Sequence, residues 1–191
     1  MILVEFSRKG LHLFSSIIPL SYLWIFKEKS VLLVLLGILS IISILIELFR
    51  FKIEPVNIFF KKFFNFMLRK NELKGSITGA TWLIIGNLVT IYLYPIYIAV
   101  PALLFLSIGD SFAALFGKKI PKFKIGQKSI IGTLAGIFSS LVVVLLVNQI
   151  LPTYVLVIGA VIAMLVELIP FPINDNLTIP ILSGLIMIIV L

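Results

Sequence analysis

The chain contains no cysteine and few charged residues. Of its 191 residues only 13% are Asp, Glu, Lys or Arg, about half the share of a soluble domain. The missing cysteines exclude disulfides and thiolate metal sites. No G-x-x-x-x-G-K-[ST] segment is present, so the chain is not a P-loop nucleotide-binding protein. With 61% hydrophobic residues, it has too few polar side chains to cover a soluble core.

Long apolar segments occupy most of the chain. Because about 20 apolar residues cross the hydrocarbon core of a bilayer, we expect one all-α domain over 1–191. Its predicted architecture is a polytopic transmembrane helical bundle with about seven spans. The predicted spans are 10–26, 31–49, 76–94, 95–116, 130–150, 153–169 and 177–191. The first and last are short, and Pro180 lies near the start of the last.

The segment 53–70 has helical amphipathicity. Seven apolar side chains recur at i, i+3 and i+4: Val56, Phe59, Phe60, Phe63, Phe64, Met67 and Leu68. Asn57, Lys61, Lys62, Asn65 and Arg69 fall opposite them, and Pro55 suits the first turn of a helix. The pattern predicts a helix lying in the headgroup plane. A cytoplasmic extension of a transmembrane helix is the alternative.

Basic residues fall on one side of the predicted bundle. With seven spans, fourteen of the 16 lysines and arginines share the side of the N-terminus, and only Lys27 and Lys29 lie opposite. The positive-inside rule therefore predicts a cytoplasmic N-terminus in the cell membrane. Every unusual polar residue is predicted on that face too, as in an enzyme that joins a cytosolic substrate to a lipid. A transporter or scaffold, the alternative, would line a path across the bilayer instead.

Asp110 and the basic loop after it form the candidate phosphate and metal site. An ionisable residue inside an apolar span is costly and is by default a candidate functional residue. Gly117 shares its helix face at i+7. Lys128 stands directly before Ser129 and Gly132, at a helix start suited to an anion. Asp110 is therefore predicted to hold Mg²⁺ on nucleotide phosphates. The alternative is close helix packing, with Asp110 paired to a lysine.

A second helix start repeats this pattern. The segment from Lys74 through Ser76, Thr78 and Gly79 resembles the one from Lys128 to Gly132. If the likeness is real, it predicts a second serine-capped N-terminus able to bind an anion.

Two further groups complete the predicted site. Arg8, Lys9 and His12 lie within one turn of each other, which favours phosphate contact, although a lone histidine also serves as a structural residue. Glu47 is predicted either to bind metal or to pair with Arg50 at i, i+3.

The last polar stretch lies before the final span. Asp175 and Asn176 follow a proline-rich turn after Glu167. Asn176 is predicted as a nucleotide contact. Asp175 is predicted to be a second metal ligand or the general base.

Five segments in order resemble one enzyme family. They are RKGLHLF at 8–14, KGSITGATW at 74–82, GDSFAALFGKK at 109–119, KSIIGTLAG at 128–136 and ELIPFPINDNLTIP at 167–180. They resemble motifs of the family that contains dolichol kinase, phytol kinase and CTP-dependent diacylglycerol kinase. In the same order, these motifs are R-K-x-x-H, S-G-A-T, G-D-x-x-A-x-x-x-G, K-S-x-E-G-x-x-A-G and E-x-x-P…D-D-N-x-x-I-P. Ile131 stands where that family usually has glutamate, and Asn174 where the first aspartate of D-D-N is common.

The resemblance implies a kinase that uses CTP and Mg²⁺ to phosphorylate a membrane lipid alcohol, a prenol or diacylglycerol. The central motif is also similar to phosphatidate cytidylyltransferase, whose P-G-H-G-G…D-R-x-D segment is absent here. The expected partners are CTP, the lipid alcohol and the bilayer, without nucleic acid. A homodimer is possible.

Overall fold

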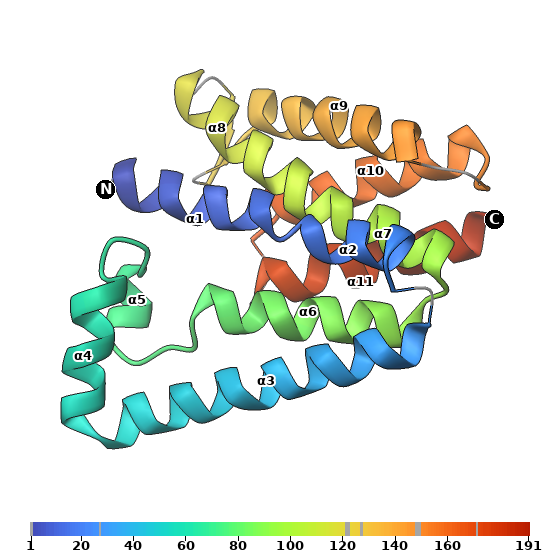
Figure 1. The fold of residues 1–191 in the computed structure, drawn as a ribbon. Helices are drawn as coiled ribbons and strands as arrows, with labels where there is room; N and C mark the ends of the chain where they lie inside the picture. Colours follow the sequence, from blue (N-terminus) through green and yellow to red (C-terminus); the bar gives the residue numbers. More distant parts are fainter. Residues whose placement is uncertain (1, 27, 121–122, 127, 148–149, 171) are drawn as a thin grey trace.

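The computed structural model describes residues 2–26, 28–120, 123–126, 128–147, 150–170 and 172–191 (Figure 1). Lys27, used in the orientation argument, lies outside these residues. In chain order the helices are α1 (Ile2–Phe14), α2 (Ile17–Trp24), α3 (Lys29–Lys52), α4 (Glu54–Phe64), α5 (Lys70–Leu73), α6 (Gly79–Leu93), α7 (Ile96–Leu104), the π-helix η1 (Phe105–Asp110), α8 (Ser111–Lys119), α9 (Ile130–Val147), α10 (Thr153–Leu168) and α11 (Asp175–Val190). A two-stranded antiparallel hairpin of β1 (Lys124–Ile125) and β2 (Lys128–Ser129) interrupts the otherwise helical fold of the described residues.

Within the described part of the chain, three helices are long and apolar enough to cross a membrane. They are α3, the continuous helix Ile96–Lys119 formed by α7, η1 and α8, and α9. These three correspond to the predicted spans 31–49, 95–116 and 130–150. Helices α6, α10 and α11 are apolar but have only 15, 16 and 16 residues, fewer than the ~20 that a perpendicular span needs. Length and composition therefore support three spans rather than the expected seven.

The predicted first span is two helices, α1 and α2, rather than one. Pro19 has no backbone N–H to donate to the carbonyl of Ser15. The Ser15 and Ser16 hydroxyls instead donate to the carbonyls of His12 and Leu13, each at 2.6 Å. Such local side-chain bonds compete with the helical ladder, so the helix breaks after Phe14.

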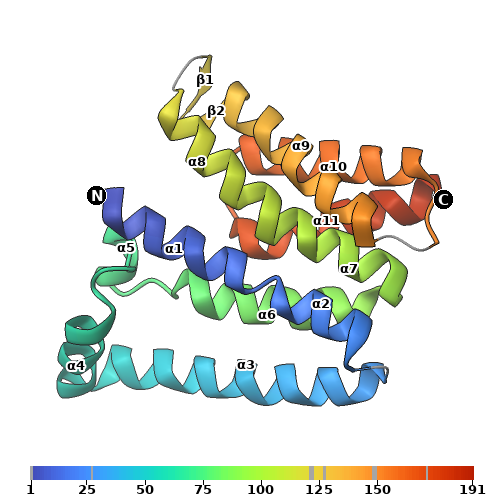
Figure 2. The same ribbon diagram turned by 45° about the horizontal axis from the view of Figure 1, so that its top comes forward.

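Helix α4 confirms that the amphipathic segment is helical, although it ends at Phe64 and does not reach residue 68. The chain turns sharply after Lys52, and α4 runs crosswise to α3 at one end of the molecule (Figures 1 and 2). No residue of α4 is fully buried, and Phe59 and Phe63 are largely exposed. A position in the headgroup plane stays a prediction.

The central element is the continuous α7–η1–α8 helix, which α1, α2, α6, α9, α10 and α11 contact, whereas α3 packs against α6 (Figure 2). Its middle turns are buried from Ile98 to Ser107. π-Helical turns are rare in proteins, and many of those that occur lie at functional sites. Here the π-helical turn ends at Asp110. The Ser111 hydroxyl donates to the carbonyl of Ser107 at 2.7 Å. This turn directs the Asp110 side chain toward α1.

Close backbone approaches set the positions of α9 and α11. A Cβ on Gly132 would lie 2.3 Å from the carbonyl oxygen of Ala113, so α9 packs directly against the backbone of α8. A Cβ on Gly86 would lie 2.1 Å from the carbonyl oxygen of Asn176, so α6 and the start of α11 are similarly close. Glycine is required at both positions because any side chain would separate the helices.

Candidate functional site

Asp110 is the centre of a buried charged cluster. Its Oδ2 lies 2.6 Å from Lys9 Nζ and 3.4 Å from His12 Nδ1. Lys9, His12 and Asp110 are only 5%, 5% and 7% exposed. The His12 Nδ1 atom makes no hydrogen bond, although it is buried. The structure thus brings together residues that the sequence placed in two separate segments, and the lysine paired with Asp110 is Lys9.

Asp110 is the predicted ligand of Mg²⁺, and this role stays a prediction. Mg²⁺ is usually bound by one or two carboxylates together with substrate phosphates and water. Within the described residues no three His, Cys, Asp or Glu side chains gather as a metal site. The three predicted metal ligands Asp110, Asp175 and Glu47 therefore do not form one group. Asp110 supplies a single carboxylate, and both of its ion pairs are made by Oδ2.

Lys128 is held between two carboxylates at the start of α9. Its Nζ lies 2.9 Å from Asp175 Oδ2 and 3.3 Å from Glu167 Oε1, and it also donates to the Glu167 carbonyl. Partial burial acts to lower the pKa of Lys128, but the carboxylates of Glu167 and Asp175 outweigh it and raise that pKa. Asp110 acts in the same direction. The two charged clusters are therefore within electrostatic reach of each other, and Lys128 stays protonated.

The Ser129 start of α9 is capped as predicted. The Ser129 hydroxyl accepts a hydrogen bond from the backbone N–H of Gly132 at 3.0 Å. Gly117 faces this turn, since a Cβ there would lie 3.2 Å from the Ser129 Oγ. Gly117 and Gly132 thus allow α8 and α9 to approach closely. Their predicted contact with phosphate stays a prediction.

The predicted serine cap of the other helix start is wrong. Helix α6 begins at Gly79, and its N-cap is Thr78, whose hydroxyl accepts from the Thr81 N–H at 3.4 Å. Ser76 lies in the preceding loop, where its carbonyl accepts from Arg50 at 2.8 Å. Ser76 is two residues too early, because the chain bends before α6 begins. Lys74 is exposed at the end of α5.

Protein carboxylates bind the N-terminus of α6. Glu47 Oε1 accepts from the Thr78 N–H at 2.8 Å, and Glu72 Oε1 accepts from the Gly79 N–H at 2.9 Å. The helix dipole and free N–H groups favour an anion at this place. Glu47 also pairs with Arg50 at 2.6 Å, which confirms the i, i+3 alternative. This end of α6 is thus occupied by the protein's own anions, and the sequence did not single out Glu72 for that position.

Asn176 joins α11 to α6 through a hydrogen bond from its Nδ2 to the carbonyl of Gly79 at 2.7 Å. It is buried. The bond fixes the start of α11, and with it the neighbouring Asp175, relative to α6. Asn176 therefore helps to position Asp175, which pairs with Lys128.

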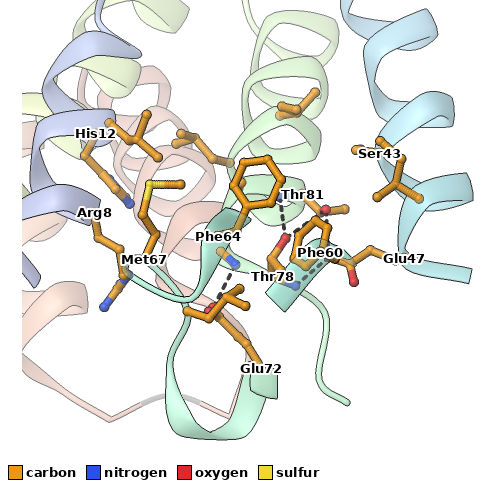
Figure 3. Close-up of a pocket in the computed structure, with 17 residues that line it drawn as sticks. Arg8, His12, Ser43, Glu47, Phe60, Phe64, Met67, Glu72, Thr78 and Thr81 are labelled. Carbon is orange, nitrogen blue, oxygen red and sulfur yellow. Dashed lines mark hydrogen bonds between the residues drawn. The ribbon is translucent and has the colours of Figure 1, made fainter. Parts of the chain in front are cut away.

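A cavity of about 350 Å³ lies between α1, α3, α4 and α6. Figure 3 shows Arg8 and His12 entering it from α1, with Ser43 and Glu47 on the facing helix α3. Most of its walls are apolar: Leu11, Ile46, Phe60, Phe64, Met67, Leu68, Ala80, Leu83 and Ile84. His12 lines the cavity and also contacts Asp110. The cavity therefore adjoins the buried charged cluster. Sequence periodicity could not reveal it, because four separate helices form its walls.

The sequence of the chain is distantly similar to that of a curated bacterial protein. The chain is 29% identical over 184 residues to an uncharacterized protein of Rickettsia prowazekii (strain Madrid E), and the match covers 92% of this chain and 89% of that protein. No family model matches the chain. No solved structure matches it either.

Proposed function

We propose that this chain is an integral membrane kinase that transfers the γ-phosphate of CTP to the hydroxyl of a membrane lipid alcohol. The observation that carries the proposal is the buried Lys9–His12–Asp110 cluster beside a largely apolar cavity. A lipid kinase needs a charged site for phosphates next to an apolar site for the acceptor. The choice of CTP rests on the five motif segments and their resemblance to the polyprenol kinase family.

In the proposed reaction the acceptor oxygen forms a bond to the γ-phosphorus. The bond from that phosphorus to the oxygen bridging to the β-phosphate breaks, and CDP leaves. The hydroxyl proton passes to the His12 imidazole, and the resulting cation faces the Asp110 carboxylate. Lys9, Lys128 and Arg8 supply positive charge for the phosphates, which is the main task of a phosphoryl-transfer site. Asp175 orients Lys128 through their ion pair.

Bound Mg²⁺ would neutralise phosphate charge during the transfer. Asp110 is the residue that would hold it. The single carboxylate in this cluster suits an ion whose other ligands are phosphate and water oxygens.

We further propose that the short helices α6, α10 and α11 cross the membrane together with the three long ones. The α1–α2 pair would complete a bundle of about seven spans with a cytoplasmic N-terminus and site. The supporting observation is the distribution of charge: Lys128 lies just before α9, and Asp110 lies in the second half of the continuous helix Ile96–Lys119, which the lysine-rich segment joins to α9. The membrane would be the cell membrane.

Position-specific labels in CTP test the reaction. Purified protein in lipid nanodiscs is supplied with a lipid alcohol and with CTP labelled at either the γ- or the α-phosphate. A kinase transfers the γ-label to lipid and releases CDP. Transfer of the α-label to phosphatidate with release of pyrophosphate would instead identify a cytidylyltransferase. If neither label enters lipid with any alcohol or with phosphatidate, the enzyme proposal is wrong.

A further inference from the structure

The cavity between α1, α3, α4 and α6 has features of a lipid-chain site. Most of its walls are apolar, and its polar side chains lie on α1, on the facing helix α3 and around the start of α6 (Figure 3). We propose that it binds the hydrocarbon chain of a single-chain lipid alcohol, with the hydroxyl at His12. This inference rests on the proposed function in one respect, since it takes the occupant to be the phosphate acceptor.

Arg8 and His12 are the polar side chains on the α1 side of the cavity, and both are available to a ligand. Glu47, Glu72 and Thr78 are already bound within the α6 N-terminal network. Among the described residues Arg8 makes no side-chain hydrogen bond or ion pair. The buried His12 Nδ1 makes no hydrogen bond, and it lies 3.4 Å from Asp110 Oδ2. Arg8 and His12 are four residues apart and so share one face of α1. A hydroxyl beside this face of α1 would contact the Arg8 guanidinium and could transfer its proton to the His12 imidazole.

The size of the cavity favours one chain over two. Ligand pockets range from roughly 300 to 1,000 Å³, and this one, at about 350 Å³, is near the lower limit. A glycerolipid with two acyl chains needs much more room beside its hydroxyl. A segment of a single chain fits the volume, and the rest of the chain can leave toward the bilayer.

The cavity opens on a surface suited to lipid. Ile46 and Phe64 line it and are 43% and 39% exposed. They lie on α3, a helix long enough to cross the membrane, and on α4, which carries exposed phenylalanines. An alcohol dissolved in the bilayer would therefore enter between α3 and α4 without crossing water.

A matched pair of neighbours on α3 tests the assignment. Ile46 lines the cavity, whereas Leu45 does not and is equally exposed at 44%. Protein in nanodiscs is illuminated with a diazirine-bearing hexadecanol, and labelled peptides are mapped by mass spectrometry. In Ile46→Trp the indole fills the cavity mouth, and labelling of α4 and α6 should fall about tenfold, the equivalent of ~1.4 kcal/mol of binding free energy. Leu45→Trp should change it less than about twofold, because it removes no cavity contact.

Competition on the unaltered protein needs no variant. Unlabelled hexadecanol should suppress the labelling, and dipalmitoylglycerol at the same mole fraction should not. Equal competition by both lipids, labelling confined to the outer faces of the helices, or equal effects of the two tryptophan variants would overturn the inference.

The kinase proposal is judged separately. Cavity labelling without transfer of γ-label would reject the kinase and keep the cavity assignment. Transfer of γ-label with an unchanged KM for hexadecanol in Ile46→Trp would keep the kinase proposal and reject the cavity assignment.

Discussion

Removal of the Asp110 charge has two separable consequences. In Asp110→Asn the Lys9 ammonium keeps its charge in a site where its side chain is only 6% exposed. Loss of one partner of a buried ion pair costs about 3–5 kcal/mol, because an uncompensated charge remains. We therefore expect this variant to lose both turnover and a comparable part of its unfolding free energy. A fall in activity alone would not show that Asp110 acts in catalysis.

The double variant Lys9→Met, Asp110→Asn separates the two effects. It removes both charges at nearly constant volume, and replacing a whole buried pair is often neutral or stabilising. Its unfolding free energy should therefore exceed that of Asp110→Asn by at least ~2 kcal/mol, and the cycle of four proteins gives the coupling energy directly. Turnover should stay at least ~10²-fold below that of the native protein, as after loss of a main electrostatic contribution to the transition state.

The assay measures denaturant unfolding in detergent micelles and the initial rate of γ-label transfer from CTP on the same preparations. Lys9→Met alone serves as the control, since it leaves Asp110 buried without its closest cation. If the double variant regains stability and also regains turnover to within about tenfold of the native protein, the pair is structural. The catalytic role of Asp110 would then be refuted.

Three further predictions concern other parts of the molecule. Lys128→Ala should lower kcat/KM for CTP at least ~10²-fold, whereas Lys124→Ala, which removes an exposed lysine of the same hairpin, should lower it less than ~5-fold; equal losses would mean that only the bulk charge of the loop matters. Gly86→Ala should lower the unfolding free energy by at least ~2 kcal/mol, because its Cβ would meet a backbone carbonyl of α11 at 2.1 Å. Gly37→Ala, with no atom within 4 Å, should raise it by ~0.5–1 kcal/mol, and a similar loss in both would contradict the close packing of α6 and α11. Because the chain has no cysteine, Lys124→Cys should react with an impermeant maleimide only from the cytoplasm and Tyr92→Cys only from outside; the reverse result would invert the proposed orientation.

Local sequence information was sufficient for the helices and for part of the site. Apolar length predicted α3, α7–α8 and α9, because hydropathy over 20 residues is a property of a continuous segment. The 3.6-residue period predicted α4, and the spacing of Arg8 and His12 placed them on one helix face. Pro19 and the serines before it carried the signal for the break between α1 and α2, although the long apolar run concealed it. Length and composition support three of the seven predicted spans, because α6, α10 and α11 have only 15, 16 and 16 residues.

Only the tertiary structure decided which charges meet. Lys9 and Asp110 are about a hundred residues apart in the chain, and the π-turn and the packing of α1 bring them to 2.6 Å. Glu47 looked like a metal ligand in sequence, but the fold directs it to the N-terminus of α6, where backbone N–H groups bind it. The cavity likewise has no sequence pattern, because four helices each contribute a few side chains to it. Hydropathy and periodicity act along the chain, whereas ion pairing and cavity formation depend on distances that only helix packing sets.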